Sequence, residues 1–262
     1  MPSAFEITPL DDRALSDRGH RLCMSGPGSL RGARRNAASG YGLQVGFYRE
    51  HILPRLVDRA CGSASLRDWR AAVTRGLEGR VVELGFGSGL NLEHYPASVS
   101  VVLAVEPARV ARRLAARRVA SSGVTVEHVG LDGQSIPLDD ESCDGALSTF
   151  TLCTIPDAAA GLAELRRVIR PGGRFHFLEH GLAPDPAVEA WQRRLEPLQR
   201  RLAGGCHLTR DIPQLIAGAG FDIERLEQSY AKGPRPWTWF TMGVAIAPTH
   251  VRGVERSFER LP

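Results

Sequence analysis

The sequence contains no long hydrophobic run. No stretch approaches the ~20 consecutive apolar residues that a membrane-spanning helix requires, so we expect no membrane span. The first twenty residues carry Glu6, Asp11 and Asp12 and lack the apolar segment of a secretory signal. The 262 residues are 43% hydrophobic and 24% charged, a composition typical of one globular domain. We therefore expect a soluble, cytoplasmic protein.

Disulfide and metal-ligand patterns are also absent. The five cysteines form no C-x-x-C pair and are scattered over the chain, as Cys23, Cys61, Cys143, Cys153 and Cys206. This pattern predicts neither a disulfide framework nor a zinc site, and most of these side chains are expected to be buried in a reducing compartment. His176 and His180 are four residues apart, but they occur in a run that reads as a strand, where this spacing does not converge on a metal. We therefore expect no metal site.

Aromatic residues are scarce, at 6% of the chain, and no basic segment is interleaved with them. The net charge of +4 arises from arginines and acids that are interspersed, as in residues 189–196, which is typical of a solvated helix face. A basic composition alone indicates only non-specific attraction to polyanions. We therefore expect no nucleic-acid partner.

The spacing of apolar residues predicts the organisation of the chain. Helical spacing occurs over residues 41–59, where Pro54 kinks or restarts the helix, and again over 65–77 with Ser65 as N-cap. The expected organisation is a mobile or loosely docked leader over residues 1–40, a domain whose N-terminal helices form a cap over 41–250, and a tail over 251–262.

Strands alternate with helices after Gly79. Short apolar runs bounded by turn residues occur at 81–84, 101–105, 124–129, 144–149 and 174–178. Their alternation with helical segments predicts a parallel sheet with helices on both faces. Two more runs, at 221–230 and 239–247, have no convincing helix between them and predict an antiparallel hairpin. The expected fold is a doubly wound, Rossmann-like α/β domain with a mostly parallel seven-stranded sheet and a C-terminal antiparallel hairpin.

A glycine-rich loop follows the first predicted strand. It reads Glu83-Leu-Gly85-Phe86-Gly87-Ser-Gly89, and a helix is expected to begin at about Ser88. Glycine allows the main chain to approach a ligand closely. The G-x-G-x-G spacing differs from the G-x-G-x-x-G of dinucleotide sites, and the preceding acid suits a cationic ligand better than a pyrophosphate. The amino group and sulfonium of S-adenosylmethionine are positive, so the loop favours a methyltransferase over a dehydrogenase.

Polar residues also follow the next three strands. Glu106, followed by Pro107, ends the second strand, where a carboxylate can accept hydrogen bonds from both ribose hydroxyls. The run Asp132-Gly133-Gln134 lies just beyond the third strand and is either the adenine side of the site or a polar surface turn. Thr149 ends the fourth strand and is assigned to the same cofactor site. Together these residues predict a nucleoside site at the carboxyl edge of the sheet.

These motifs resemble those of the class I S-adenosylmethionine-dependent methyltransferases. The run 83–89 looks like their first motif, Glu106 like their ribose acid, and 165–173 like their helix-to-fifth-strand motif. Asp132-Gly133-Gln134 resembles their adenine-side loop, although many members have Ala-Glu in its last two positions. The resemblance implies S-adenosyl-L-methionine as cofactor.

A narrower resemblance is to the group containing the mammalian alkyl thiol methyltransferases. It is carried by the runs 91–96, 152–154, 179–180 and 205–210. This resemblance implies in-line methyl transfer to a small, lipophilic acceptor, with a thiol favoured. It also places Tyr48 over the methionine end of the cofactor.

The acceptor side is expected to include His180 as the candidate catalytic residue. Its side chain either accepts the acceptor's proton or hydrogen-bonds a polar substrate group, and the alternative is that it only supports the next loop. Glu179 either contacts the acceptor or pairs with Arg210. Cys206 and His207 either line the acceptor pocket or form a capping loop before a helix with Thr209 as N-cap. The expected acceptor-side residues are Glu179, Cys206, His207, Arg210 and Trp237.

Three alternatives stay open at this point. The acceptor could be a quinone, phenol or lipid amine rather than a thiol. The protein could be an NAD-dependent oxidoreductase, which would also use Glu106 to bind a ribose, but such enzymes typically have the G-x-G-x-x-G spacing. A non-catalytic S-adenosylmethionine sensor would bind the cofactor without turnover. The sequence determines neither the acceptor nor the oligomeric state.

Overall fold

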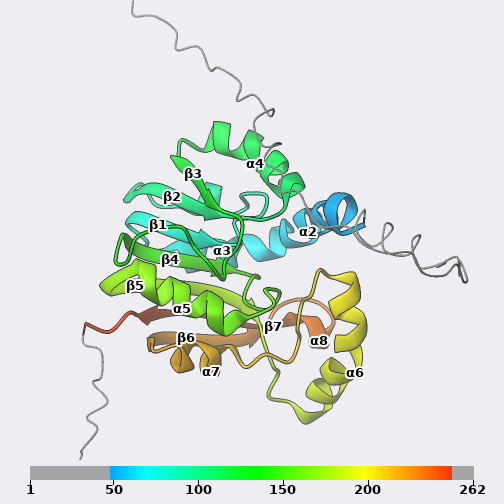
Figure 1. The fold of residues 1–262 in the computed structure, drawn as a ribbon. Helices are drawn as coiled ribbons and strands as arrows, with labels where there is room; N and C mark the ends of the chain where they lie inside the picture. The colour runs from blue at the N-terminus through cyan, green and yellow to red at the C-terminus, as the bar shows by residue number, and fades with distance from the viewer. Residues whose placement is uncertain (1–47, 250–262) are drawn as a thin grey trace, which may run out of the picture. The chain divides into compact units, whose positions relative to one another are not determined.

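The computed structural model describes residues 48–249, excluding the side chains of residues 49 and 50, so the expected leader and the tail over 251–262 lie outside it. The described strands form one seven-stranded sheet in the order β3-β2-β1-β4-β5-β7-β6 (Figure 1). The strands are β1 (Gly79–Leu84), β2 (Val99–Val105), β3 (Val126–Gly130), β4 (Cys143–Thr149), β5 (Ile169–His180), β6 (Asp222–Tyr230) and β7 (Trp239–Ile246).

The strand pairing confirms the predicted doubly wound topology. β1 pairs in parallel with β2 and β4, and the parallel pairing continues outward to β3 and β5. β7 is antiparallel to both of its neighbours, β5 and β6. The predicted C-terminal hairpin is therefore confirmed, with its second strand inserted between the first strand and the parallel sheet.

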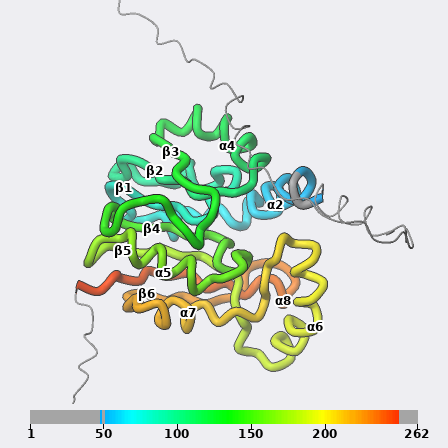
Figure 2. The backbone as a smooth tube through the Cα atoms, viewed as in Figure 1, coloured from blue at the N-terminus to red at the C-terminus, as the bar shows by residue number. Residues whose placement is uncertain are grey.

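Helices cover both faces of the sheet, and Figure 2 shows α5 and α7 on the same face. The helical elements are η1 (Tyr48–Ile52), α2 (Leu53–Cys61), η2 (Ala64–Leu66), α3 (Arg67–Thr74), η3 (Leu92–His94), α4 (Arg109–Ser122), α5 (Ala158–Val168), α6 (Pro186–Leu202), α7 (Ile212–Gly218) and α8 (Arg235–Thr238). Within residues 48–249, no helix has the length and apolar character needed to cross a membrane.

Alternation along the strands produces two cores, because successive strand side chains point to opposite faces. Val82 of β1 packs with Leu162 of α5 and Ile212 of α7 in one core. Its neighbour Val81 packs with Val73 of α3 and Ala115 of α4 in the other. The central strands are buried on both faces, as expected of parallel strands between helical layers.

Three expected helix starts are wrong. No α-helix begins at Ser88; the chain instead forms turns and the short η3, because Gly89 has a left-handed φ of +76° that an α-helix cannot contain. Ser65 lies inside η2, and α3 begins only at Arg67. Thr209 does not cap α7, because the Asp211 side chain accepts from the Gln214 amide and so is the N-cap.

Candidate functional site

A cavity of about 420 Å³ lies where the parallel strands end. Its wall includes the segments that follow β1, β2, β3 and β4, together with parts of α2 and the turn after α6. In Figure 1, α2 and α6 lie beyond the same end of the sheet, and the Tyr48 hydroxyl on η1 donates to the carbonyl of Leu202 at 2.7 Å. The cavity thus occupies the crevice in which doubly wound folds bind their ligands. Its wall comprises residues 53–54, 57–58, 61, 70, 84–88, 90–91, 105–108, 111, 131–133, 149–151, 154–156 and 203–204.

The glycine loop forms one side of the cavity. Gly85 and Gly87 have left-handed φ values of +73° and +58°, which a residue with a side chain adopts only under strain. A Cβ on Gly85 would lie only 2.0 Å from the Thr151 hydroxyl. The buried Phe86 ring packs edge-on against His128, with ring centroids 5.7 Å apart. The loop therefore presents main chain to the cavity, as its sequence predicts.

Glu106 faces the same cavity from the end of β2. Its Oε2 accepts from the Gly87 amide at 2.8 Å and its Oε1 from the Ala108 amide at 2.7 Å. Burial raises the pKa of this carboxyl, whereas the two amide bonds lower it. Each oxygen keeps acceptor capacity, since a carboxylate oxygen has more than one lone pair. This geometry suits a ligand with two adjacent hydroxyl donors, such as a ribose.

Glu83 is buried beneath the residues that line the cavity and is not itself part of the wall. Its carboxylate accepts from the Asn91 amide at 2.7 Å and from the Tyr95 hydroxyl at 2.6 Å. Burial raises its pKa to about 7. Asn91 in turn accepts from the Arg70 guanidinium at 2.7 Å, and Arg70 also donates to the Thr149 hydroxyl at 3.2 Å. Asn91, Arg70 and Thr149 all line the cavity, so Glu83 acts on the site through them.

The sequence analysis missed Arg70 and Asn91. Arg70 is only 5% exposed on α3, yet as one of 33 basic residues it carries no distinguishing pattern in the sequence. A buried guanidinium beside a cavity can form paired hydrogen bonds with a ligand carboxylate. Asn91 begins the run 91–96 that carries the narrower resemblance, but its place in the site follows only from its hydrogen bond to the buried Glu83.

Phe150 is a further wall residue that the sequence did not indicate. It follows β4 with a left-handed φ of +54°, and its amide donates to the Leu178 carbonyl at 2.8 Å. A non-glycine residue in this region is costly and persists only where its surroundings impose it. Its ring packs against His180 and Phe240, with centroids 5.0 and 5.2 Å away.

Comparison with known proteins identifies the family. Residues 82–177 match the model of a methyltransferase domain. Thiol S-methyltransferase TMT1B of Rattus norvegicus is 31% identical over 174 residues, which span 63% of this chain and 68% of that protein. The chain belongs to the S-adenosylmethionine-dependent methyltransferases. The demethylmenaquinone methyltransferase of Clavibacter sepedonicus is 33% identical over 46% of this methyltransferase and 50% of its own length.

A solved S-adenosylmethionine-dependent methyltransferase from Mesorhizobium loti shares the fold. It superposes with a TM-score of 0.53 at 20% identity, over 70% of this chain and 98% of its own. Because the chain belongs to the S-adenosylmethionine-dependent methyltransferases, its cofactor is S-adenosyl-L-methionine, and the alternative of an NAD-dependent oxidoreductase is wrong. The polar groups of the cavity suit that cofactor. The buried Glu106 carboxylate could bind the ribose hydroxyls, and the buried Arg70 guanidinium could bind the carboxylate of the methionyl group.

The loop over residues 132–134, which is predicted to contact adenine, divides between two places. Asp132 and Gly133 line the cavity, as does Pro107 next to Glu106. Gln134 instead donates its main-chain amide to the Asp132 carboxylate at 2.9 Å and accepts from the amide of Asp157, the N-cap of α5, at 3.0 Å. Gln134 therefore joins this loop to α5. Gly89 lies beside a smaller neighbouring cavity that also contains Arg70.

Glu179 and Arg210 organise the loop after β4 rather than pair with each other. Glu179 is fully buried, and its carboxylate accepts from the Ser148 hydroxyl at 2.7 Å and from the amides of residues 151 and 153. Arg210 donates to the carbonyls of residues 152, 155 and 156. Of the two alternatives for Glu179, the ion pair with Arg210 is not formed, because the hydrogen bonds of each residue go to the main chain and hydroxyl groups around that loop.

His207 and Trp237 both contact α6. His207 Nδ1 is 3.1 Å from Glu196 Oε1, and the Trp237 indole donates to Gln199 Oε1 at 3.1 Å. Trp237 packs against a small core of Cys153, Cys206 and Leu208. Several residues that were predicted to contact the cofactor or the acceptor are absent from the cavity wall over residues 48–249. These are Tyr48, Glu179, His180, Cys206, His207, Arg210 and Trp237.

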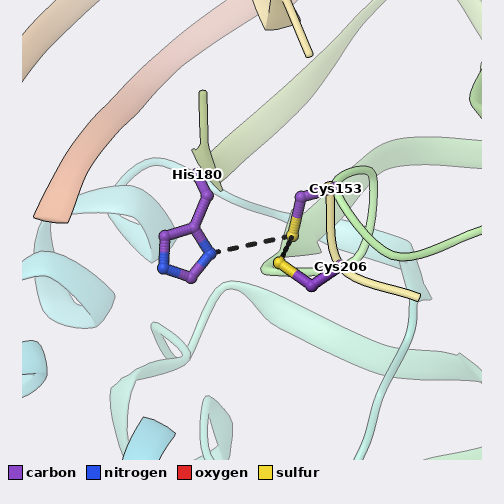
Figure 3. Close-up of side chains that lie close together, drawn as sticks. All are labelled: Cys153, His180 and Cys206. Atoms are coloured by element: carbon purple, nitrogen blue, oxygen red, sulfur yellow. Dashed lines mark hydrogen bonds between the residues drawn. The ribbon is translucent and has the colours of Figure 1, made fainter. Parts of the chain in front are cut away.

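His180 lies behind Phe150 and beside two cysteines. Its Nδ1 is 3.8 Å from the Sγ of Cys153, and that sulfur is 3.8 Å from the Sγ of Cys206 (Figure 3). Sequence spacing predicted no metal site, yet the fold brings together three potential ligands from β5 and two separate loops. Spacing along the chain cannot reveal a cluster whose members are 27 and 53 residues apart.

Proposed function

We propose that this methyltransferase transfers the methyl group to a small, lipophilic thiol. The observation that carries the proposal is the apolar part of the cavity wall. This part of the wall consists of Leu53 and Val57 of α2 together with Phe150, Ile155 and Pro156. Such a wall favours an apolar acceptor, because removing its surface from water contributes roughly 25 cal/mol per Å².

The similarity to TMT1B, which is named a thiol S-methyltransferase, supports a thiol within that lipophilic class. A thiol whose pKa is near the free-cysteine value of roughly 8.5 is already a few per cent thiolate near neutral pH, so for such a thiol no catalytic base is obligatory. We therefore assign the protein the tasks of positioning the acceptor and excluding water, rather than of activating it by a dedicated base.

When bound, S-adenosylmethionine would supply a methyl group activated by its sulfonium, and S-adenosylhomocysteine would be the leaving group as the acceptor bonds to the methyl carbon. Glu106 would accept hydrogen bonds from the ribose, and Asp132 and the Gly133 main chain would contact the adenine. Arg70 would hold the carboxylate of the methionyl group. Phe150 and the apolar residues of α2 would exclude water from the acceptor side.

The test is turnover against matched acceptors. An alkyl thiol and the alcohol of equal chain length are compared with a phenol, a quinol and a lipid amine, and formation of S-adenosylhomocysteine is measured. We expect the thiol to be the best substrate, with kcat/KM rising as the alkyl chain lengthens. Equal or better turnover of the phenol, quinol or amine, or no effect of chain length, would contradict the proposal.

A quinone is the second candidate. It is favoured by the 33% identity to a protein named demethylmenaquinone methyltransferase, which covers half of that protein. A quinol would occupy the same apolar wall, so the cavity alone does not separate it from a thiol. In the acceptor panel, this candidate predicts methylation of the quinol and none of the thiol.

A further inference from the structure

The cluster of Cys153, His180 and Cys206 lies outside the cofactor cavity. Its three ligand atoms all lie within 4.8 Å of one another, and Figure 3 shows the two sulfurs and the imidazole converging. Cys153 and Cys206 are 1% and 5% exposed, and His180 is half-buried. Thiolates and imidazole are the ligands that zinc and other soft or borderline ions prefer.

Two of the three distances in the cluster are close to those of tetrahedral coordination. With Zn–S bonds of ~2.3 Å and Zn–N bonds of ~2.0 Å, the edges of a tetrahedron are about 3.8 Å between sulfurs and about 3.5 Å between sulfur and nitrogen. The observed Cys153–Cys206 and Cys153–His180 distances are both 3.8 Å. The third pair, Cys206 and His180, lies within 4.8 Å, so binding of an ion draws these two side chains closer together.

The ligands are held by their surroundings before any ion binds. The His180 ring lies against Phe150 and Phe240, with centroids 5.0 and 5.2 Å away. The Cys153 amide donates to the buried Glu179 at 3.2 Å, and the Cys153 carbonyl accepts from the His207 amide at 2.7 Å. That second bond joins the loop after β4 to the loop that carries Cys206. Such outer contacts fix ligand orientation in metal sites.

We propose that Cys153, Cys206 and His180 form a binding site for one zinc ion. Binding replaces two S–H bonds with two Zn–S bonds and releases two protons to solvent, so two thiolates balance the ion's charge. Three protein ligands leave the fourth tetrahedral position for water or an added thiolate. This site does not depend on the proposed thiol acceptor.

The site is next to the cofactor cavity. Thr154 lines the cavity, and its hydroxyl is 3.5 Å from the Cys153 sulfur. Ala203 also lines the cavity, and its carbonyl accepts from the Cys206 amide at 3.2 Å. Phe150 separates His180 from the same cavity. An ion here would therefore stabilise the two loops that form the acceptor side of the wall.

The experiment uses the full chain, reduced with a phosphine and freed of metal, then titrated with zinc against a chromophoric chelator and with cobalt as a spectroscopic probe. We expect one ion per chain and a thiolate-to-cobalt charge-transfer absorption. Cys206→Ser and His180→Phe, which keeps an aromatic ring between Phe150 and Phe240, should each weaken zinc binding at least tenfold. Cys143→Ser, at a buried cysteine on β4, is the matched control and should bind as the wild type does.

Circular dichroism of each variant checks that it is folded. Absence of stoichiometric zinc binding by the reduced wild-type chain would overturn the proposal, as would cobalt bound without thiolate absorption. Unchanged affinity in folded Cys206→Ser and His180→Phe would also overturn it. Loss of two titratable thiols on mild oxidation of the wild type, but of neither Cys153→Ser nor Cys206→Ser, with no zinc bound by the reduced chain, would overturn the proposal and identify these two residues as a disulfide pair.

Discussion

At the scale of single residues, the site depends on buried charge. Glu83 and Arg70 are 1% and 5% exposed, and Asn91 lies between them. Burying a charge without partners is costly, and here each group has hydrogen-bond partners that reduce that cost.

The pKa of Glu83 predicts a pH-dependent stability. Burial raises this pKa from 4.5 to about 7, so the folded state binds the proton more tightly than the unfolded state. The stabilisation from this group is therefore present below about pH 4.5 and is lost as pH rises to about 7, by about 3 kcal/mol at 1.4 kcal/mol per pKa unit. Glu83→Gln cannot lose a proton and should gain free energy of unfolding relative to wild type across this window.

Chemical denaturation of both proteins between pH 4.5 and 7.5 measures this difference. Burial also raises the pKa values of Glu106 and Glu179, but both residues are present in both proteins, so their contributions cancel in the comparison. Parallel pH profiles for wild type and Glu83→Gln would show that Glu83 is ionised in both the folded and unfolded states, contrary to this account.

Arg70 is predicted to recognise the carboxylate of the cofactor. Hydrogen bonds to charged groups contribute about 1.5–3 kcal/mol, so Arg70→Met should weaken S-adenosylmethionine binding at least tenfold. Methylthioadenosine has the same nucleoside but no carboxylate, so its affinity should change less than twofold. Calorimetric titration of both ligands into both proteins tests this. Equal losses for the two ligands would mean that Arg70 acts only by supporting the wall.

At the scale of secondary-structure elements, α2 is attached to the glycine loop. The Asp58 carboxylate accepts from the Ser88 hydroxyl at 2.5 Å and from Arg118 of α4 at 2.8 Å. One side of the cavity thus depends on a short helix with exposed apolar residues, of which Leu56 is 51% exposed. Elements with few buried contacts open with small free energies.

Asp58→Ala is predicted to release α2. We expect faster amide hydrogen exchange over residues 53–61 and about fivefold weaker cofactor binding, equivalent to about 1 kcal/mol for partly exposed charged hydrogen bonds. Asp222→Ala, at an exposed acid on β6, is the control and should change neither quantity. Unchanged exchange in Asp58→Ala would mean that other contacts hold the helix in place.

At the scale of the whole molecule, the cavity wall combines segments between residues 53 and 204. The unfolded chain cannot reproduce this wall, so the cofactor binds only the folded state. At one hundred times Kd, S-adenosylmethionine should add about 2.7 kcal/mol to the free energy of unfolding and raise Tm by about 5–10 °C. Thermal unfolding with and without cofactor measures this, and an equal shift with NAD would contradict the cofactor assignment.

The strands and the order of motifs were predictable because they depend on local patterns. Val81 to Leu84 form a short apolar run closed by glycines, and such runs have few alternatives to a buried strand. The prediction of a helix beginning at Ser88 was wrong because Gly89, which belongs to the glycine loop, has a left-handed backbone conformation that interrupts an α-helix. Local patterns thus predicted elements better than their ends.

The partners of buried side chains were not predictable in this way. Arg70 and Asn91 meet only because α3 and the turn after β1 pack together, and Cys153 meets Cys206 only through the arrangement of two loops. Neither meeting is encoded in a spacing along the chain. The acceptor-side residues predicted from the sequence therefore lie outside the cavity wall, and Glu179 and Arg210 stabilise the loop after β4.

The most direct test of the central assignment is calorimetric titration of S-adenosylmethionine and S-adenosylhomocysteine into the wild-type protein and Glu106→Ala. Glu127→Ala, at an exposed acid on the adjacent β3, is the control. We predict that wild type and the control bind both ligands with similar affinity. Glu106→Ala should bind each at least tenfold more weakly, a loss of about 1.4 kcal/mol. Failure of the wild type to bind either ligand, or equal binding by folded Glu106→Ala, would contradict the account.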